Sequence, residues 1–174
     1  MRLIHLVEDV LRLAKADAAR MDLHKTESRI EDLILQELDI FRPQFDSKKI
    51  RTETQFDKGV DRLLADPDKI TQVVTNLLQN ACQYTPEEGS VKIYTEQASG
   101  EMRVVFANTG GELSQEDFPF IFERFYRGEK SRSREHGGAG IGLAIVKELV
   151  EAHDGHVGAE ISEDETRIWF SLPL

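Results

Sequence analysis

The stretch Gly137-Gly138-Ala139-Gly140-Ile141-Gly142-Leu143 is followed at once by a run with helical periodicity, Ala144-Ile145-Val146-Lys147-Glu148-Leu149-Val150. Because glycines carry no side chain, backbone N–H groups in this stretch can approach a ligand closely. The helix that follows directs the positive end of its dipole at the same place. The pattern predicts an anion site, with nucleotide phosphates as the expected ligand, although a glycine-rich turn before a helix also serves plain packing.

The length, composition and net charge of the whole chain limit the classes of protein to which it can belong. A chain of 174 residues is one ordinary domain with at most a short appendage, and its 40% apolar share supports a core. A net charge of -10 argues against general nucleic-acid binding. The lone cysteine, Cys82, excludes a disulfide framework and is expected to be a small buried apolar residue.

The first 20 residues predict a helix, because apolar residues recur at steps of three and four: Leu3, Leu6, Val7, Val10, Leu13, Ala14 and Ala18. Such a short helix does not fold alone, so it is expected to pack on its own domain or on a second copy. Its abrupt start suggests a piece of a longer helical hairpin. Residues 21–27 are expected to form a polar joint.

Helices and strands then alternate. Ser28 is the expected N-cap of a second helix, with Glu31 completing a capping box, and Arg42-Pro43 is expected to end that helix. Residues 50–56 predict a strand and residues 63–65 a short one. Asp66 as N-cap and Pro67 as first helical residue predict a third helix, which reaches about Cys82.

The second half predicts more sheet. Residues 91–96 and 101–106 alternate as two strands around a hairpin turn at Gly100. About 25 irregular residues follow, with a short helix expected near residues 116–122, and an irregular segment of this length is typical of a lid. After the glycine-rich turn come a helix to His153 and strands at 156–161 and 167–172. The fold class is α+β, a mixed sheet with helices on one face.

Three polar features suggest chemistry. Asn76 and Asn80 lie one turn apart on the third helix, where amides suit Mg²⁺ and phosphate, or form a plain solvent-facing pair. Asn108 ends a strand before Thr109-Gly110, where it could bind an adenine edge or simply form a turn. The lid carries a basic and aromatic cluster that fits polyphosphate, or is a solvated charge run pinned by core phenylalanines: Phe118, Phe120, Phe122, Arg124, Phe125, Tyr126, Arg127, Lys130, Arg132 and Arg134.

Taken together, these motifs resemble the catalytic and ATP-binding domain of bacterial sensor histidine kinases. The run from Asn76 to Ala81 with Tyr84-Thr85-Pro86 resembles the family's N box, and Asn108-Thr109-Gly110 its first glycine box. The run from Phe122 to Arg127 resembles the F box, and the run from Gly138 to Leu143 the second glycine box. Thr166 resembles the family's late threonine, and residues 1–22 resemble the end of the second helix of its dimerisation hairpin.

The resemblance implies a Bergerat ATP-binding fold, a two-layer α/β sandwich with a mobile ATP lid. Its implied domains are the hairpin helix at 1–22, a linker at 23–28 and the ATP-binding domain at 29–174. It implies transfer of the ATP γ-phosphoryl group to a histidine on the hairpin and then to an aspartate of a response regulator receiver domain. The parent is implied to be a homodimer anchored in the bacterial membrane, with this part in the cytoplasm.

The resemblance also implies residue roles. Asn80 would hold Mg²⁺, and Asn76, Asn80 and Arg127 would form the catalytic set. Asn108 would bind adenine, and the glycines of the second glycine box would lie under the phosphates. The implied ATP-binding residues are Asn76, Asn80, Gln83, Tyr84, Asn108, Gly110, Tyr126, Arg127, Gly138, Ala139, Gly140, Ile141, Gly142, Leu143 and Thr166.

Three positions depart from the family pattern. Asn108 stands where Asp is usual, so the contact to the adenine amino group loses charge assistance. Glu112 replaces the second glycine of its box, and Gln83 replaces a phosphate-facing cation. These departures leave room for a second hypothesis, a degenerate interaction module without nucleotide. Hydrolysis is disfavoured, because Asn76 stands where related ATPases place a glutamate base.

None of the five histidines has the context of the family's phosphoacceptor: His5, His24, His136, His153 and His156. His5, His24 and His153 are expected to be surface or packing residues, and His136 could touch phosphate. The sequence therefore predicts a fragment that binds ATP but does not phosphorylate itself.

Overall fold

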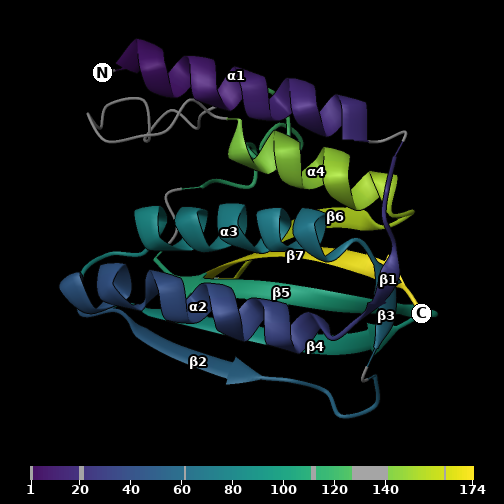
Figure 1. Ribbon diagram of the computed structural model, residues 1–174. Coiled ribbons are helices and arrows are strands. Elements are labelled where there is room, and N and C mark those ends of the chain that lie inside the picture. Colours follow the sequence, from purple (N-terminus) through teal and green to yellow (C-terminus); the bar gives the residue numbers. More distant parts are fainter. Residues whose placement is uncertain (1, 20–21, 61, 111–112, 127–140, 163) are drawn as a thin grey trace.

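The structure is a computed structural model that describes residues 2–19, 22–60, 62–110, 113–126, 141–162 and 164–174 (Figure 1). Its helices are α1 (Arg2–Ala19), α2 (Ile30–Ser47), α3 (Pro67–Tyr84) and α4 (Gly142–Ala152). Its strands are β1 (Thr26–Ser28), β2 (Arg51–Gln55), β3 (Leu63–Ala65), β4 (Ser90–Ala98), β5 (Glu101–Thr109), β6 (His156–Ser162) and β7 (Glu165–Pro173).

The main sheet has five strands in the order β2-β4-β5-β7-β6, and β1 pairs with β3 in a separate two-stranded sheet. Strands β2 and β4 run parallel, whereas all other neighbours in the main sheet are antiparallel. The sheet is therefore mixed, as predicted. The β4–β5 hairpin turns through Ser99 and Gly100, both with positive φ, which matches the right-handed twist of the flanking strands.

Helices α2, α3 and α4 cover one face of the sheet, and α1 lies across α4 (Figure 1). The core lies between these layers, where Ile34, Leu77 and Leu149 from the three covering helices and Ile93 and Phe170 from the sheet are all at most 1% exposed. Alternation along β4, β5 and β7 places one side of each strand against the helices, which is why the sheet has a single apolar core face.

The predicted start and end of the second helix are wrong. Ser28 lies in β1, where its hydroxyl donates to the carbonyls of Thr26 and Ala65, so it caps no helix. Helix α2 runs through Pro43 to Ser47. Two residues beyond the proline, Phe45 is 1% exposed and packs near Phe41 of the preceding turn, with ring centroids 6.4 Å apart. Burial of this aromatic pair outweighs the local cost of an internal proline.

Two further expectations need correction. The polar joint includes a strand, because β1 pairs with β3 in the register Thr26 to Ala65. The short helix expected near residues 116–122 is a series of turns. Backbone bonds there span three residues, from Asp117 N–H to Ser114 O and from Phe120 N–H to Asp117 O. Asp117 accepts from the backbone and hydroxyl of Ser114, which favours a turn over a helix.

The start of α3 is confirmed. The Asp66 carboxylate accepts from the backbone N–H groups of Asp68 and Lys69, and Pro67 occupies the first helical position. The same carboxylate accepts from the N–H of His24, and the Asp66 N–H donates to Nε2 of His153. The predicted N-cap thus also joins the chain before β1 to the end of α4. Among the described residues, no helix has the length and apolar character needed to cross a bilayer.

Candidate functional site

A cavity of about 110 Å³ lies between α3 and the start of α4. Its lining combines residues from α1, α3, the segment 113–126 and α4: Asp9, Arg12, Asn76, Gln79, Asn80, Gln83, Tyr84, Ile121, Tyr126, Gly142 and Leu143. Seven of these belong to the ATP-binding set predicted from the sequence: Asn76, Asn80, Gln83, Tyr84, Tyr126, Gly142 and Leu143. We call this space the α3–α4 cavity.

Helix α3 presents its amides to the cavity because its opposite stripe is in the core. Val73, Leu77 and Ala81 are at most 2% exposed, and the cavity-lining residues lie on the remaining surface of the helix. Asn76 donates from Nδ2 to the carbonyl of Gln72 at 2.9 Å, which fixes the orientation of its amide. Its Oδ1 then faces Gly142, where an added Cβ would lie 3.4 Å from that oxygen. The N box and the second glycine box therefore meet at this atom.

Tyr126 reaches the cavity from the turns of segment 113–126. Its hydroxyl donates to Oδ1 of Asp117 at 2.5 Å, and its ring lies 5.6 Å from that of Phe120. Asp117 also accepts from Ser114 at both the backbone N–H and the hydroxyl. One buried carboxylate therefore joins both ends of this segment, while Ile121 lines the cavity and Phe122 packs against the core.

The adenine side of the predicted site lies apart from the α3–α4 cavity. A second cavity, of about 300 Å³, is lined by Gly110, Leu113, Ile161, Ser162, Asp164, Glu165 and Thr166. Asn108 and Thr166 are directly opposite each other on β5 and β7, and both are buried on the helix-facing side of the sheet. Among the described residues, Gly110 and Thr166 of the predicted ATP-binding set thus line a different cavity from the α3 residues, and Asn108 is a lining residue of neither.

Asn108 has a feature that suits a ligand. It is 5% exposed, and its Nδ2 has no hydrogen-bond partner among the described residues. Leaving a buried amide N–H unpaired costs about 1–3 kcal/mol, so such groups call for an explanation. An adenine ring offers both a nitrogen acceptor and an amino donor, which match the two ends of a carboxamide.

The remaining predicted residues are placed differently. Ile141 is 1% exposed and precedes α4, so it could serve a ligand only through its backbone. Gly110 has φ of +66°, and an added Cβ would lie 3.1 Å from the ring of Pro86, so a side chain is disfavoured there. Arg127, Gly138, Ala139 and Gly140 lie outside the described residues, as do Glu112 and His136.

Four lining residues were not predicted from the sequence. Gln79 lies within the predicted N box, Ile121 directly precedes the predicted F box, and both line the cavity. Asp9 and Arg12 belong to α1, about 65 residues away in the chain, and form an ion pair at 4.0 Å. Their only sequence signal was helical spacing, because an i,i+3 pair shares one face.

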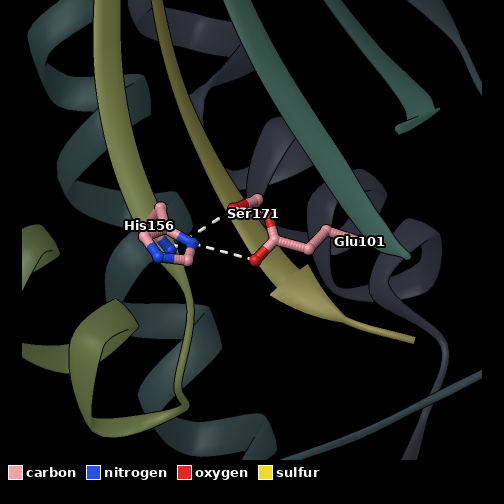
Figure 2. A network of polar contacts seen from close by, with 3 residues as sticks. All are labelled: Glu101, His156 and Ser171. Atoms are coloured by element: carbon pink, nitrogen blue, oxygen red, sulfur yellow. Dashed lines mark hydrogen bonds and ion pairs between the residues drawn. The ribbon is translucent and has the colours of Figure 1, made fainter. Parts of the chain in front are cut away.

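A second polar cluster, Glu101, His156 and Ser171, joins the other end of β5 to β6 and β7 (Figure 2). Nδ1 of His156 lies 2.8 Å from Glu101 Oε1, and the Ser171 hydroxyl donates to Glu101 Oε2 at 2.9 Å. The hydroxyl of Ser171 accepts from the backbone N–H of His156. Because the serine proton is directed at the carboxylate and no histidine ring nitrogen takes it, the cluster ties strands together and is not arranged for nucleophilic catalysis.

Comparison with known proteins places this chain in a family. The family of histidine kinase-, DNA gyrase B- and HSP90-like ATPases matches residues 65–174, and the chain belongs to that family. The match begins just before α3 and includes every element around the α3–α4 cavity except α1. The resemblance drawn from the sequence is thereby confirmed.

The relatives are sensor histidine kinases. The chain is 35% identical to sensor histidine kinase WalK of Bacillus subtilis (strain 168), a match that covers 99% of this chain and 28% of WalK. It is 33% identical to signal transduction histidine-protein kinase BaeS of Escherichia coli (strain K12), over 99% of this chain and 37% of BaeS. The chain therefore spans about a third of the length of these relatives.

Solved structures agree on the fold. The catalytic domain of histidine kinase ThkA superposes with a TM-score of 0.77 at 28% identity, covering 87% of this chain and 96% of that one. Full-length ShkA in complex with AMPPNP superposes with a TM-score of 0.85 at 31% identity, covering 98% of this chain and 35% of that one. The predicted ATP-binding sandwich, with a mixed sheet and helices on one face, is confirmed.

Proposed function

We propose that this chain is the ATP-binding catalytic part of a sensor histidine kinase. The observation that carries the proposal is the meeting of two distant motifs at one cavity. Asn76 and Asn80 of α3 line one cavity with Gly142 and Leu143 of α4 and with Tyr126, and Asn76 faces Gly142. ShkA, whose structure aligns with 98% of this chain, was solved with the ATP analogue AMPPNP.

In the proposed reaction, a histidine imidazole attacks the γ-phosphorus of ATP. An N–P bond forms, the bond from that phosphorus to the bridging oxygen breaks, and ADP leaves. The protein's task in such a transfer is mostly to position the groups and to stabilise charge. Asn76 cannot act as a base, which fits a nucleophile brought by another part of the protein better than it fits water attack.

The amides of α3 also suit a metal. Mg²⁺ prefers oxygen ligands and takes one or two from protein, with the rest from water and phosphate. Asn80 would hold Mg²⁺ through its amide oxygen, and the ion would neutralise phosphate charge. Asn76 has its amide nitrogen committed to Gln72, which leaves its oxygen free to face the phosphates. The residues present therefore fit Mg²⁺ because they offer amide oxygens as ligands.

Domain organisation and partners follow the same proposal. Residues 1–22 would belong to the dimerisation hairpin, 23–28 to a linker and 29–174 to the ATP-binding domain of a membrane-anchored homodimer. The described apolar side chains of α1 are mostly exposed, including Leu3 at 74%, Ile4 at 61% and Leu11 at 55%, which suits pairing with another helix. Histidine kinase ThkA has been solved in complex with the response regulator TrrA, which supports a receiver domain as the second acceptor here.

The direct test is calorimetric titration with AMPPNP, with and without Mg²⁺. We expect binding in the micromolar to sub-millimolar range that weakens without Mg²⁺. Asn80→Ala should remove most of the Mg²⁺ dependence. Gln44→Ala, which removes an exposed amide on α2, is the matched control and should bind as the unchanged chain does. Absence of binding at millimolar AMPPNP would favour the alternative, a degenerate interaction module of the same fold.

Phosphoryl transfer needs its own assay. The chain is incubated with ATP labelled at the γ-phosphate and with a helical hairpin that carries the acceptor histidine, supplied separately. Label should appear on the hairpin and not on the chain. An acid-stable label on the chain itself would contradict transfer to histidine, since phosphohistidine is lost in acid.

A further inference from the structure

Helix α1 contributes charge to the α3–α4 cavity. Asp9 and Arg12 line it together with Asn76, Asn80 and Gln83. The position of α1 is set by Leu13, which is 5% exposed and belongs to the core cluster, and by packing along α4 (Figure 1). Because Leu13 neighbours Arg12, the same docking that buries the leucine places the guanidinium at the cavity.

The described part of the cavity lining has little positive charge. Among its described lining residues Arg12 is the one cation, and α3 offers only the neutral amides of Asn76, Gln79, Asn80 and Gln83. A triphosphate carries about four negative charges at neutral pH, and neutral amides can donate hydrogen bonds to it but cannot balance that charge. Arginine binds phosphate oxygens with charge-assisted, often bidentate hydrogen bonds.

We propose that Arg12 is a phosphate-binding residue of the nucleotide site, supplied by α1 in place of a cation on α3. This inference rests on the proposed function, because it names how the same cavity holds the phosphates of ATP. It makes α1 part of the nucleotide site, so that undocking of the helix lowers affinity for ATP.

Asp9 competes for the same guanidinium. The Arg12–Asp9 contact is 4.0 Å long, and the Arg12 side chain is 55% exposed, so the pair is a loose surface ion pair. By comparison, Arg42 and Asp39 on α2 have the same i,i+3 spacing and a contact of 2.7 Å. Arg12 can therefore turn from Asp9 to a phosphate at little cost.

The experiment compares Arg12→Gln with Arg42→Gln in the full chain, using AMPPNP and AMP with Mg²⁺. Arg12→Gln should weaken AMPPNP binding about tenfold, the effect of one exposed charged hydrogen-bonding contact, and leave AMP within about twofold. Arg42→Gln should leave both unchanged. Arg12→Lys, which keeps the charge, should recover part of the loss, and higher salt should reduce the difference.

A rescue variant separates charge from structure. In the double variant Arg12→Gln with Gln83→Arg, the cation returns to the cavity from α3, and AMPPNP affinity should recover. Equal losses for AMPPNP and AMP, or no loss at all in Arg12→Gln, would overturn the role of Arg12 while the unchanged chain still bound nucleotide. If the unchanged chain bound neither, the proposed function itself would fail.

Discussion

At the scale of single residues, a substitution of Gly142 tests whether this glycine is needed for packing or for ligand binding. It begins α4, lines the α3–α4 cavity and has no positive φ, and an added Cβ would make only ordinary contact with Asn76. Packing and backbone conformation therefore do not require glycine here. Gly142→Ala should leave the free energy of unfolding unchanged or raise it by up to about 0.5 kcal/mol, and should weaken AMPPNP binding several-fold. Urea unfolding and titration measure the two effects, and a parallel loss of both would make Gly142 a packing residue.

At Asn108 we expect a substitution to lower stability and to raise nucleotide affinity. Asn108→Asp replaces an unpaired buried amide with a carboxylate in a site that is 5% exposed. Without nucleotide the variant should lose about 1–3 kcal/mol of stability, because a buried charge is poorly solvated. With nucleotide it should gain affinity several-fold, since the carboxylate accepts a charge-assisted bond from the adenine amino group. Thermal unfolding with and without AMPPNP tests this, and an unchanged ligand-induced shift in Tm would place adenine elsewhere.

At the scale of elements, the proline within α2 predicts a stabilising change. Pro43 is exposed, and it removes the backbone bond to the carbonyl of Asp39 in a helix that continues to Ser47. Pro43→Ala should raise the free energy of unfolding by about 1–2 kcal/mol, less than the full propensity difference of about 3 kcal/mol because proline also restricts the unfolded chain. A loss of stability in urea unfolding would mean that a proline-induced bend is needed to seat Phe45.

The junction of α3 and α4 predicts a pH dependence. Burial lowers the pKa of His153, an effect that its hydrogen bond to the Leu149 carbonyl opposes only in part. The unfolded chain then binds a proton at a higher pH than the folded chain does. This histidine should therefore reduce stability as pH falls below its ordinary value of about 6.5, and should have no effect above it.

His153→Gln tests that dependence, because glutamine can still accept from the Asp66 N–H but does not titrate. Stability in urea should vary less between pH 7.5 and 5.5 than in the unchanged chain. Gln44→Ala, which changes an exposed residue without an ionisable group on α2, should show the unchanged slope. Asp66 affects stability in a lower pH range than His153 does. Burial raises its pKa, but hydrogen bonds from the backbone N–H groups of His24, Lys69 and Asp68 lower it overall, so its contribution is lost only below about pH 4.

At the scale of the whole molecule, the docking of α1 should control the nucleotide site. Leu13→Ser removes the apolar contact that seats this helix, whereas Leu11→Ser changes a side chain that is already 55% exposed. Leu13→Ser should weaken AMPPNP binding by about the same factor as Arg12→Gln, and the double variant should be no worse than either, because both act through one contact. Leu11→Ser should bind as the unchanged chain does. Titration of the unchanged chain, the three single variants and the double variant tests this, and additive losses would show that Leu13 and Arg12 act independently.

The sequence alone predicted the parts whose signal is local. Helical spacing predicted α1 and α3, Asp66-Pro67 marked the start of α3, and Ser99-Gly100 marked the hairpin turn. The order of the polar motifs predicted the family, since a helix face presents Asn76 and Asn80 together in any fold that buries the opposite stripe. These features depend on residues only a few positions apart, so the chain specifies them before it folds.

The tertiary structure decided what depends on residues far apart. By local preference Pro43 ends a helix, but burial of Phe45 stabilises the continuation of α2 through it. By local preference Ser28 is an N-cap, but pairing of β1 with β3 places it in a strand. Helical spacing put Arg12 and Asp9 on one face of α1 but did not indicate that Arg12 reaches the α3–α4 cavity, because its position depends on the docking of Leu13 against a core built by the rest of the chain. At these positions long-range burial outweighs local preference, and only the folded chain shows where it does so.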